Sequence, residues 1–499
     1  MAFLTALGAL VALLAAAYTH LFIYKQWTLP CRNVKGPEPV SLLFGNLLHL
    51  VRHHDLAQQM ADWAKIYGHT YRYRVLLGKP RICTIDPAAI NYILSHTEIF
   101  VKPSAGRKYL ASFLGNGLLV AEGADHKRQR RVLNQCFNQQ AIKDLLPIFY
   151  DKAEELSEKL LGLVEEDPQN EAAPTPTKPE GIQIGGRKID VMKYIAMCTI
   201  DIIGLAGFGY ELDSLSGTKN EMAEAFKKMF SSFGPLAIVQ ALIPGASLIP
   251  TKNMKDRRAS LATTERVGRR LLAERKAAVH ADHVESVNKI DVVGKDLLSV
   301  CVRANMAADL KPENRLSDKE VLDQISTFMF AGNETTSTAL TWTLSLLSRH
   351  PEIQDQLREE CLAVSTPRPS FEEISAMPIL AGVVHEGLRL YPPVPVLIQE
   401  AQQDTIIPLD TPIEGRNGQM MDHIKVSKGT AFTTAYSNVH CAERTWGTDA
   451  ASFRPSRHFQ AKAESEGKGS EASAGGVWGN ILTFSGGVRG CIGYRMATG

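Results

Sequence analysis

One long amphipathic segment, residues 317–350, sets the scale of the domain that this chain can form. Ser317 and Glu320 stand at the spacing of a capping box, which marks a helix start. The apolar pattern then continues to His350, where Pro351 prevents the helix from going further. A helix of this length, at 1.5 Å per residue, is roughly 50 Å long. We therefore expect a large domain built around this segment.

The rest of the chain predicts a mainly α fold with a small β portion. Residues 55–68 have a helical period that ends at Gly68, and residues 70–86 indicate two strands around Gly78 and Lys79. Helical patterns dominate from about residue 90 onward. No shift in composition divides the body, so we expect one domain over residues 41–499.

The first 24 residues are apolar and contain no Lys, Arg, Asp or Glu. A membrane-spanning helix needs roughly 20 apolar residues, so residues 1–24 predict a transmembrane signal-anchor. A cleaved signal peptide and a buried core helix are the alternatives. The absence of a preceding basic residue favours the anchor, and the basic residues that follow Tyr24 predict a cytosolic body. Prolines and a glycine within residues 25–40 predict a stiff hinge.

Charge and cysteine spacing exclude several classes of protein. The net charge of +2 over 499 residues argues against a dedicated nucleic-acid binder. The 8 cysteines are scattered and form no CxxC pair, which excludes a zinc ribbon and a thioredoxin-type motif. Most of them are expected to be buried, and Cys491 stands apart because of its neighbours.

The middle of the long helix carries an acid and an alcohol beside a glycine. Glu334 and Thr335 follow Gly332, which costs about 1 kcal/mol relative to alanine inside a helix. Such a glycine permits the close approach of a large flat group or a local loosening of the helix. Glu334 and Thr335 could then relay protons to a bound ligand. The alternative is a surface glutamate beside threonines that bond back to the helix.

A second helical segment, VVHEGLRLYPPVP, carries a candidate ion pair. Glu386 and Arg389 stand three residues apart and therefore on one face. Most such pairs are exposed and contribute little to stability. The apolar residues around this pair predict partial burial, for which a further partner such as Arg457 is expected.

The stretch FSGGVRGCIG surrounds Cys491 with glycines and one arginine. A thiolate that binds a metal requires backbone N–H donors and a nearby positive charge. The glycines allow the backbone to fold around the sulfur, Arg489 could pair with an anionic group of a cofactor, and Phe484 could keep the site dry.

The spacing Phe-x-x-Gly-x-Arg-x-Cys-x-Gly resembles the haem-ligating loop of the cytochrome P450 family. The matching residues are Phe484, Gly487, Arg489, Cys491 and Gly493. The resemblance implies the cytochrome P450 fold, preceded by the N-terminal transmembrane helix. It also implies haem b (iron protoporphyrin IX) with Cys491 as the ligand of the metal.

Other segments resemble further motifs of the family in the expected order. Glu334 and Thr335 match its distal acid–alcohol pair. Glu386, Arg389 and Arg457 match its structural triad. The segment GADHKRQRRVLNQCF resembles the helix that holds the haem propionates: Arg130 is kept, and His126 replaces the usual tryptophan. The basic run 126–131 suggests a docking surface for an acidic electron-donor protein.

The resemblance implies a monooxygenase that inserts one oxygen atom from O2 into a lipophilic substrate. NADPH-cytochrome P450 reductase and cytochrome b5 are the implied electron donors, with no nucleic-acid partner. The implied location is the endoplasmic reticulum membrane, with a single span and a cytosolic catalytic domain. An insert at residues 461–476 is similar to fungal members, many of which serve secondary metabolism. A reductase-independent haem-thiolate isomerase is the alternative.

Three positions depart from the family pattern. Gln399 stands where many relatives carry an arginine for a haem propionate, and Ser456 replaces a glutamate beside Arg457. The chain also stops eight residues after Cys491, where the family continues into a helix and a small sheet. We therefore expect a chain that is truncated, by an error in the gene model or in fact. A truncated, inactive, membrane-anchored remnant is the corresponding alternative function.

Overall fold

The structure is a computed structural model that describes residues 1–52, 56–165, 188–231, 251–284, 296–306, 311, 314–459 and 475–498. Most of the insert expected at residues 461–476 therefore lies outside the described residues. The chain divides into two compact units, each made of two stretches of sequence. Unit 1 comprises Met1–Arg107 and His385–Cys491, and unit 2 comprises Lys108–Val384 and Ile492–Gly499. One domain was expected over residues 41–499, and its boundaries stay a prediction.

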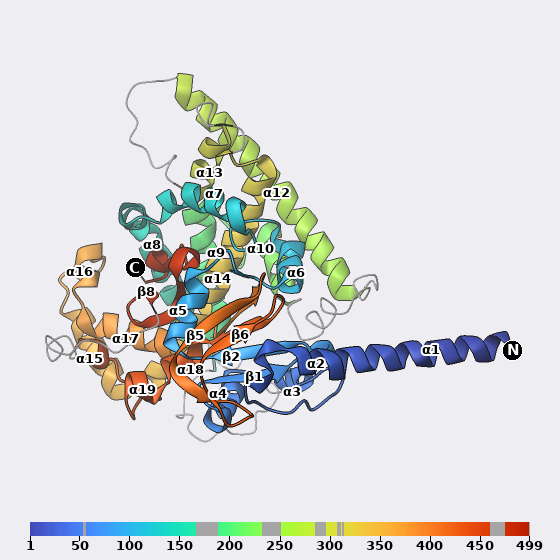
Figure 1. The fold of residues 1–499 in the computed structure, drawn as a ribbon. Coiled ribbons are helices and arrows are strands. Elements are labelled where there is room, and N and C mark those ends of the chain that lie inside the picture. Colours follow the sequence, from blue (N-terminus) through green and yellow to red (C-terminus); the bar gives the residue numbers. More distant parts are fainter. Residues whose placement is uncertain are drawn as a thin grey trace. The chain divides into compact units, whose positions relative to one another are not determined.

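Unit 1 contains every described strand of the chain (Figure 1). Its strands are β1 (Thr70–Arg74), β2 (Pro80–Thr84), β3 (Phe100–Val101), β4 (Val396–Ala401), β5 (Thr405–Glu414), β6 (Met420–Val426), β7 (Ala431–Ala435), β8 (Gly476–Trp478) and β9 (Ile481–Gly486). Its helices include α3 (Leu47–Arg52), α4 (Leu56–Tyr67), α5 (Pro87–Ser95), α18 (Tyr436–His440) and α19 (Glu443–Trp446), and its short 3₁₀ turns include η3 (Leu76–Gly78) and η8 (Gly487–Arg489).

The main sheet of unit 1 has five strands in the order β1-β2-β7-β4-β3. β1 and β2 form the expected antiparallel pair, with Tyr71 opposite Cys83. β2 runs parallel to β7, so residues from the two distant stretches of sequence pair directly, as with Ile82 and Phe432. The hairpins β5–β6 and β8–β9 are separate two-stranded sheets. β9 leads straight into the segment that contains Cys491.

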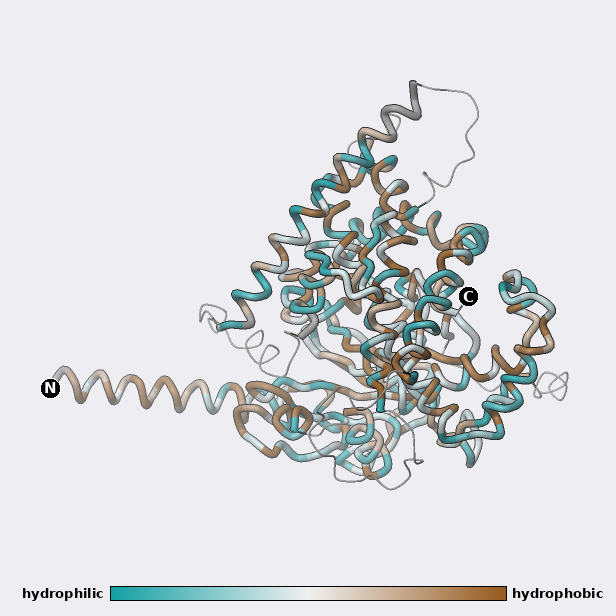
Figure 2. Tube along the Cα trace, turned by 180° about the vertical axis from the view of Figure 1, so that it is seen from behind, coloured by the Kyte–Doolittle hydropathy of each residue, from teal (hydrophilic) through white to brown (hydrophobic). Residues whose placement is uncertain are grey.

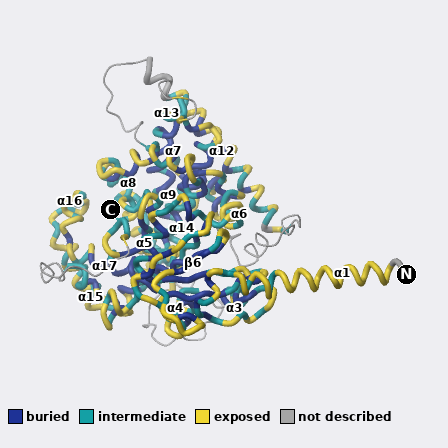
Figure 3. The backbone as a smooth tube through the Cα atoms, in the orientation of Figure 1, coloured by how far each residue is buried: buried dark blue, intermediate teal, exposed yellow. Residues whose placement is uncertain are grey.

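The N-terminal segment is one continuous helix that extends beyond the expected anchor boundary. α1 (Ala2–Tyr18), the π-helical turn η1 (Thr19–Tyr24) and α2 (Lys25–Thr28) follow each other without a break. The candidate membrane span is Phe3–Thr28, and none of the residues in its most apolar stretch is buried. Figures 2 and 3 show α1 as largely apolar and exposed. In a second apolar helix, α9 (Val191–Phe208), 56% of the residues are buried, as expected of a core helix.

The proline-rich segment after the helix is attached to unit 1. Residues 30–33 form a 3₁₀ turn, η2 (Pro30–Asn33). Gln26 Nε2 donates to Gly78 O at 2.7 Å, and Arg72 N donates to Lys35 O at 2.8 Å. A Cβ on Gly36 would lie only 1.9 Å from Arg72 O, so glycine is required where this segment passes β1. These contacts hold the expected hinge against the sheet.

Every regular secondary-structure element among the described residues of unit 2 is a helix. Its elements are most of α6 (Ser104–Leu114), α7 (Gly123–Leu133), η4 (Asn134–Phe137), α8 (Gln139–Glu165), α9, α10 (Glu221–Ser231), α12 (Lys252–Val284), α13 (Leu297–Met306), α14 (Asp318–Arg349), α15 (Pro351–Leu362), α16 (Phe371–Ser375), the first half of α17 (Pro378–Leu390) and α21 (Tyr494–Thr498). The prediction of a mainly helical fold with small sheets is confirmed.

The expected long helix is α14, at the centre of the hydrophobic core of unit 2. Its 32 residues begin with the predicted capping box between Ser317 and Glu320 and end before Pro351. Its buried residues, such as Ile325 and Met329, join a large apolar cluster with α9, α10, α12 and α13. In Figure 1, α14 runs beside α9.

Gly332 is explained by the packing of α14 against α9. A Cβ at this position would lie 2.4 Å from Ile203 Cδ1, far inside van der Waals contact. The helix is unbroken here. The sequence suggested that this glycine admits a large flat group or loosens the helix. The structure shows one close approach, that of the Ile203 side chain on the neighbouring helix, and an unbroken helix in place of a loosened one. The approach of a large flat group stays a prediction.

Candidate functional site

The segment around Cys491 is a compact turn at the end of β9. Cys491 N donates to Phe484 O at 2.8 Å and closes the turn over η8. Gly487 has φ +64°, and a Cβ there would lie 2.7 Å from Leu94 O. A Cβ on Gly490 would lie 2.4 Å from Val477 Cγ1. Glycine is therefore required at both positions, and Cys491 is left exposed at the end of the turn.

Phe484 and Arg489 of this turn differ in burial and in the groups that they contact. Phe484 is buried at 7% exposure and meets Trp478 edge-to-face, with ring centroids 5.6 Å apart. Arg489 is half-buried and donates from Nη2 to Thr97 O at 3.1 Å. Gly493, the last residue of the motif, follows the boundary between the units and belongs to unit 2.

Ser485 is a strained position in the same turn that the sequence did not single out. Its φ of +57° lies in the left-handed region, which a residue other than glycine rarely adopts. Tyr436 OH donates to Ser485 Oγ at 2.9 Å, and burial raises the pKa of that tyrosine to about 12. The surrounding contacts therefore hold the backbone in a conformation that strained functional sites often show.

Glu386, Arg389 and Arg457, expected as a triad, are in contact within unit 1. Arg389 donates to both carboxylate oxygens of Glu386, at 2.7 and 2.8 Å, and both side chains are completely buried. Arg457 Nε lies 3.3 Å from Glu386 Oε1. The pair is therefore a buried ion pair and not the exposed pair that its spacing alone favours.

Further groups satisfy this ion pair. His458 Nε2 lies 2.8 Å from Glu386 Oε2, and Asp449 accepts from Arg457. Burial alone would raise the pKa of Glu386, but the hydrogen bonds from Arg389 and His458 hold it far below the usual range. Glu386 therefore stays ionised. His458 directly follows Arg457, and the sequence offered no other sign of its role.

His440 links the ion pair to the strand that precedes the cysteine turn. Its Nδ1 donates to Arg389 O at 2.9 Å, and its Nε2 accepts from Leu482 N at 2.7 Å. Arg389 Nη1 donates in return to His440 O at 2.5 Å. Burial lowers the pKa of His440 to about 3, so it remains neutral. Thr483 Oγ1 adds a bond to Leu388 O at 2.8 Å. The triad and β9 are thus connected by hydrogen bonds.

Unit 2 holds the residues expected to bind the cofactor from α7. His126 is buried, and Arg130, one helical turn later, donates from Nε to Asn134 Oδ1 at 2.9 Å. The basic run is only partly available to a partner protein. Arg128 donates to Glu320 at 2.6 Å and ties α7 to the start of α14, whereas Lys127 and Arg131 are exposed.

The acid–alcohol pair lies in the middle of α14. Glu334 is half-buried, and burial raises the pKa of its carboxyl group above the usual value. Thr335 Oγ1 donates to Ala331 O at 2.5 Å, which is the back-bonding that the alternative interpretation expected. A threonine oxygen that donates in this way still has lone pairs with which it can accept.

The predicted residues thus divide between the two units. Unit 1 contains Phe484, Gly487, Arg489, Cys491, Glu386, Arg389 and Arg457. Unit 2 contains His126, Arg130, Glu334, Thr335 and Gly493. Their roles as site residues stay predictions.

Comparison with known proteins decides the family. The model of the family described as "Cytochrome P450" matches residues 35–498. This chain belongs to the cytochrome P450 family. The match includes unit 1 from residue 35 onward and all of unit 2 except Gly499, so the family fold accounts for the helical unit as well as the sheet-bearing one.

Fungal proteins are among the similar relatives. Cytochrome P450 monooxygenase 205 of Postia placenta is 36% identical over 500 residues, which is 99% of this chain and 88% of the relative. Cytochrome P450 monooxygenase claP of Ampulloclitocybe clavipes is 32% identical, covering 93% of this chain and 82% of the relative. Ganoderic acid synthetase of Ganoderma lucidum is 29% identical, and the match covers 98% of this chain and 89% of the relative. As a member of this family, the chain is an oxidoreductase of the monooxygenase type.

The family implies a haem-iron cofactor, and the donor set of this cytochrome P450 fits one. No group of three or more His, Cys, Asp or Glu side chains among the described residues could hold a bare metal ion. A single exposed sulfur on a glycine-rich turn instead suits an iron whose other ligands come from a macrocycle. Cys491 is exposed, whereas five of the other cysteines are buried.

Gln399 is the departure with a structural consequence in this cytochrome P450. Its side chain is 5% exposed on β4, and its Oε1 has no hydrogen-bond partner among the described residues. An arginine there would present donors, whereas the glutamine carbonyl presents an acceptor.

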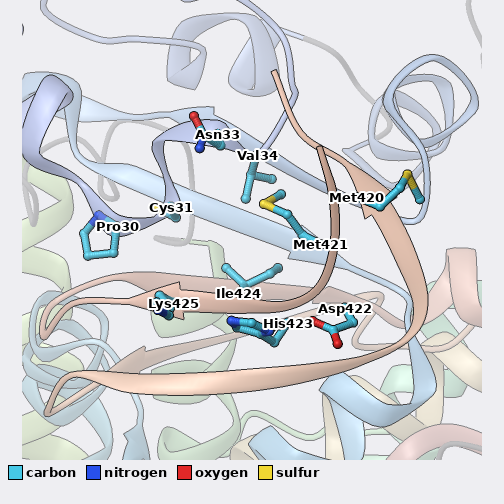
Figure 4. Close-up of a pocket in the computed structure, with 10 residues that line it drawn as sticks. All are labelled: Pro30, Cys31, Asn33, Val34, Met420, Met421, Asp422, His423, Ile424 and Lys425. Atoms are coloured by element: carbon cyan, nitrogen blue, oxygen red, sulfur yellow. Dashed lines mark hydrogen bonds and ion pairs between the residues drawn. The ribbon is translucent and has the colours of Figure 1, made fainter. Parts of the chain in front are cut away.

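A cavity of about 230 Å³ in unit 1 lies apart from the predicted site residues. It lies between η2 and β6 and is lined by Pro30, Cys31, Asn33, Val34, Met420, Met421, Asp422, His423, Ile424 and Lys425. Figure 4 shows Val34, Met421 and Ile424 close together in it. It includes none of the residues that the family motifs carry.

Proposed function

We propose that this protein is a haem-thiolate monooxygenase that inserts one oxygen atom from O2 into a lipophilic substrate. NADPH supplies the electrons through NADPH-cytochrome P450 reductase, with cytochrome b5 as a second donor. The observation that carries the proposal is the exposed sulfur of Cys491 on a turn closed by its own backbone N–H. The cofactor is haem b, which when bound supplies dioxygen activation with a thiolate that favours O–O cleavage.

The residues of the turn hold this group. Cys491 provides the sulfur ligand, and the buried ring of Phe484 keeps water from the turn. Arg489, whose Nη2 already bonds Thr97 O, carries the positive charge for a propionate. His126 and Arg130 on α7 are the further propionate donors. Gln399 carries no positive charge and cannot form an ion pair with a propionate. Arg489 and Arg130 therefore supply the positive charges for the propionates.

Glu334 and Thr335 would hold and pass on the protons that this chemistry requires. Burial raises the pKa of Glu334, so the carboxyl group holds a proton at a higher pH than an exposed glutamate does, as a proton donor requires. Thr335 Oγ1 donates to Ala331 O, which leaves its oxygen oriented to accept a proton or a hydrogen bond. Glu386, Arg389 and Arg457 act structurally behind the turn.

The protein acts at the endoplasmic reticulum membrane with a cytosolic catalytic part. The apolar, exposed helix over Phe3–Thr28 supports this placement, and Lys25 and Arg32 near its end favour the orientation. Deletion of residues 2–28 should release the chain from membranes on alkaline extraction. If the full-length chain is itself released, the anchor is wrong.

The substrate class is lipophilic, and secondary metabolism is the proposed setting. Ganoderic acid synthetase among the relatives supports this setting by its name. The family model matches through residue 498 and so does not confirm the expected truncation. That expectation stays a prediction. Sequencing the transcript beyond Gly499 tests it, together with the alternative of an inactive remnant. A reductase-independent isomerase would form product without NADPH.

The decisive experiment tests the bond between sulfur and iron. Reduced, carbon-monoxide-treated protein should show the red-shifted Soret band that a thiolate ligand produces. Cys491→Ser should abolish this band, whereas Cys361→Ser, which changes another exposed cysteine, should retain it. A wild-type protein without the band, or a Cys491→Ser variant that keeps it, contradicts the proposal.

A further inference from the structure

A series of ring contacts, tilted or edge-to-face, connects the buried ion pair of unit 1 with the cysteine turn, and we call this series the ring stack. The ring of His458, bonded to Glu386, lies 4.0 Å from that of His385. His385 lies 4.4 Å from the ring of Trp478, which meets Phe484 edge-to-face at 5.6 Å. His385 and Trp478 belong to none of the motifs that identified the family.

The β8–β9 turn presses Trp478 against His385. Trp478 is the last residue of β8 and pairs with Ile481, the first of β9. Gly479 between them has φ +60°, and a Cβ there would lie 2.8 Å from His385 Nε2. The turn therefore requires glycine both for its backbone and for its distance from the histidine.

His385 acts in this stack as a neutral ring. Burial, followed by the nearby His458, lowers the pKa of His385 to about 3. Its Nδ1 is buried without a hydrogen-bond partner among the described residues. A ring in this state contributes packing area and no charge. It therefore acts on Trp478 through packing alone and holds that ring in place from α17.

Phe484 couples the stack to the sulfur ligand. Its ring contacts Trp478, and its carbonyl accepts from Cys491 N at 2.8 Å. A shift of the Phe484 ring therefore moves the peptide that holds Cys491. Hydrogen bonding and dryness around a metal-bound sulfur tune the reduction potential of the metal.

We propose that Trp478 is a positioning residue for Cys491: it holds Phe484 in place and thereby sets the potential of the iron. This inference rests on the proposed haem-thiolate function. Without Trp478, the ring that packs against Phe484 is gone and water reaches the turn. Water around the sulfur favours the reduced, more negatively charged iron, so the reduction potential should rise.

The experiment compares three variants of the holoenzyme. Trp478→Leu removes the ring, Trp478→Phe keeps an aromatic edge for Phe484, and Trp446→Leu is the matched control. Trp446 lies 4.9 Å from the Arg389 guanidinium and 6.1 Å from His458, on the same ion pair, and no ring contact joins it to Phe484 among the described residues. The measurements are the midpoint potential and the rate at which the red-shifted Soret band of the reduced carbon-monoxide form is lost.

Trp478→Leu should raise the potential and lose the band on the order of tenfold faster, because two aromatic contacts are removed. Trp478→Phe should stay close to the wild type, and Trp446→Leu should keep the wild-type potential even where it unfolds more easily. Equal potentials in Trp478→Leu and the wild type overturn the inference, as does an equal shift in Trp446→Leu.

The design separates this inference from the proposed function. A wild-type protein without the band defeats the haem-thiolate function itself, whereas a normal wild type with unchanged Trp478 variants defeats only the positioning role. If Trp478→Leu does not fold, His385→Ala replaces it, because this variant removes the ring that contacts Trp478 on the side away from Phe484. That variant should raise the potential in the same direction, and an unchanged potential contradicts the inference.

Discussion

At the scale of single residues, burial decides which charges matter in this cytochrome P450. Glu386 and Arg389 are completely buried and bonded through two parallel contacts. The pair Asp355 and Arg358 has the same spacing on α15 but is exposed. Identical spacing thus leads to a buried network in one helix and a solvated pair in the other.

Arg389→Lys should destabilise the protein by about 3–5 kcal/mol, because it leaves a buried carboxylate without its bidentate partner. Arg358→Lys should cost less than about 1 kcal/mol, as exposed pairs do. Urea unfolding monitored by far-UV circular dichroism measures both. Similar losses for the two variants would show that the burial of Glu386 carries no special weight.

Two threonines of α14 allow a test of proton delivery. Thr335 and Thr341 both donate to the carbonyl four residues earlier, at 2.5 and 2.7 Å. Thr335→Ala should retain haem and lower the product formed per NADPH by about tenfold or more, with hydrogen peroxide released instead. Thr341→Ala should leave this ratio unchanged. Unchanged coupling in Thr335→Ala would remove the proton role.

At the scale of elements, α14 is specified at its ends by sequence and in its middle by a neighbour. The capping box at Ser317 and the proline after His350 are local signals, and both ends agree with them. In the middle, Thr199 Oγ1 on α9 donates to Asn333 Oδ1 at 2.6 Å, and Ile203 lies over Gly332. A polar and an apolar contact between the two helices therefore lie on the same turn of α14.

Gly332→Ala should destabilise unit 2 although alanine favours helices by about 1 kcal/mol. The new Cβ overlaps Ile203, and overpacking of a core costs about 1–3 kcal/mol. Gly162→Ala in α8 has nothing within 4 Å and should stabilise slightly. Thermal unfolding measures both variants. Adding Ile203→Ala to Gly332→Ala should cost less than Ile203→Ala alone, and simple additivity would contradict the proposed overlap.

At the scale of the whole molecule, buried neutral histidines make stability depend on pH. The pKa values of His385 and His440 are lowered to about 3 from an ordinary 6.5, mainly by burial. Above about pH 6.5 these histidines are uncharged in both the folded and the unfolded chain, so their contribution to stability is fully present there. Below 6.5 the unfolded chain binds protons that the folded chain refuses, and stability falls until about pH 3. Glu386, with a depressed pKa, adds a loss below about 4.5.

Each of these histidines should cost about 2 kcal/mol of stability at about pH 5. His440→Gln offers a matched test, because an amide can accept from Leu482 N and donate to Arg389 O without titrating. Its stability should fall less steeply between pH 7 and 5 than that of the wild type. Parallel urea-unfolding profiles for the two proteins would show that His440 is not the titrating group.

The sequence by itself determined the features that depend on local spacing. The motif around Cys491, the capping box of α14 and the apolar N-terminal helix are all set by residues close together in the chain, because helix caps, tight turns and apolar length act locally. The family followed from such patterns, and the family model agrees with them.

Only the tertiary structure decided what depends on residues far apart in the chain. The contacts of Glu386 with His458, of Gly332 with Ile203 and of Trp478 with His385 join segments far apart in sequence. The same holds for Arg128, which its basic neighbours marked as a docking residue but which binds Glu320. Burial and partner choice arise when distant segments pack together, so spacing along the chain carries no record of them.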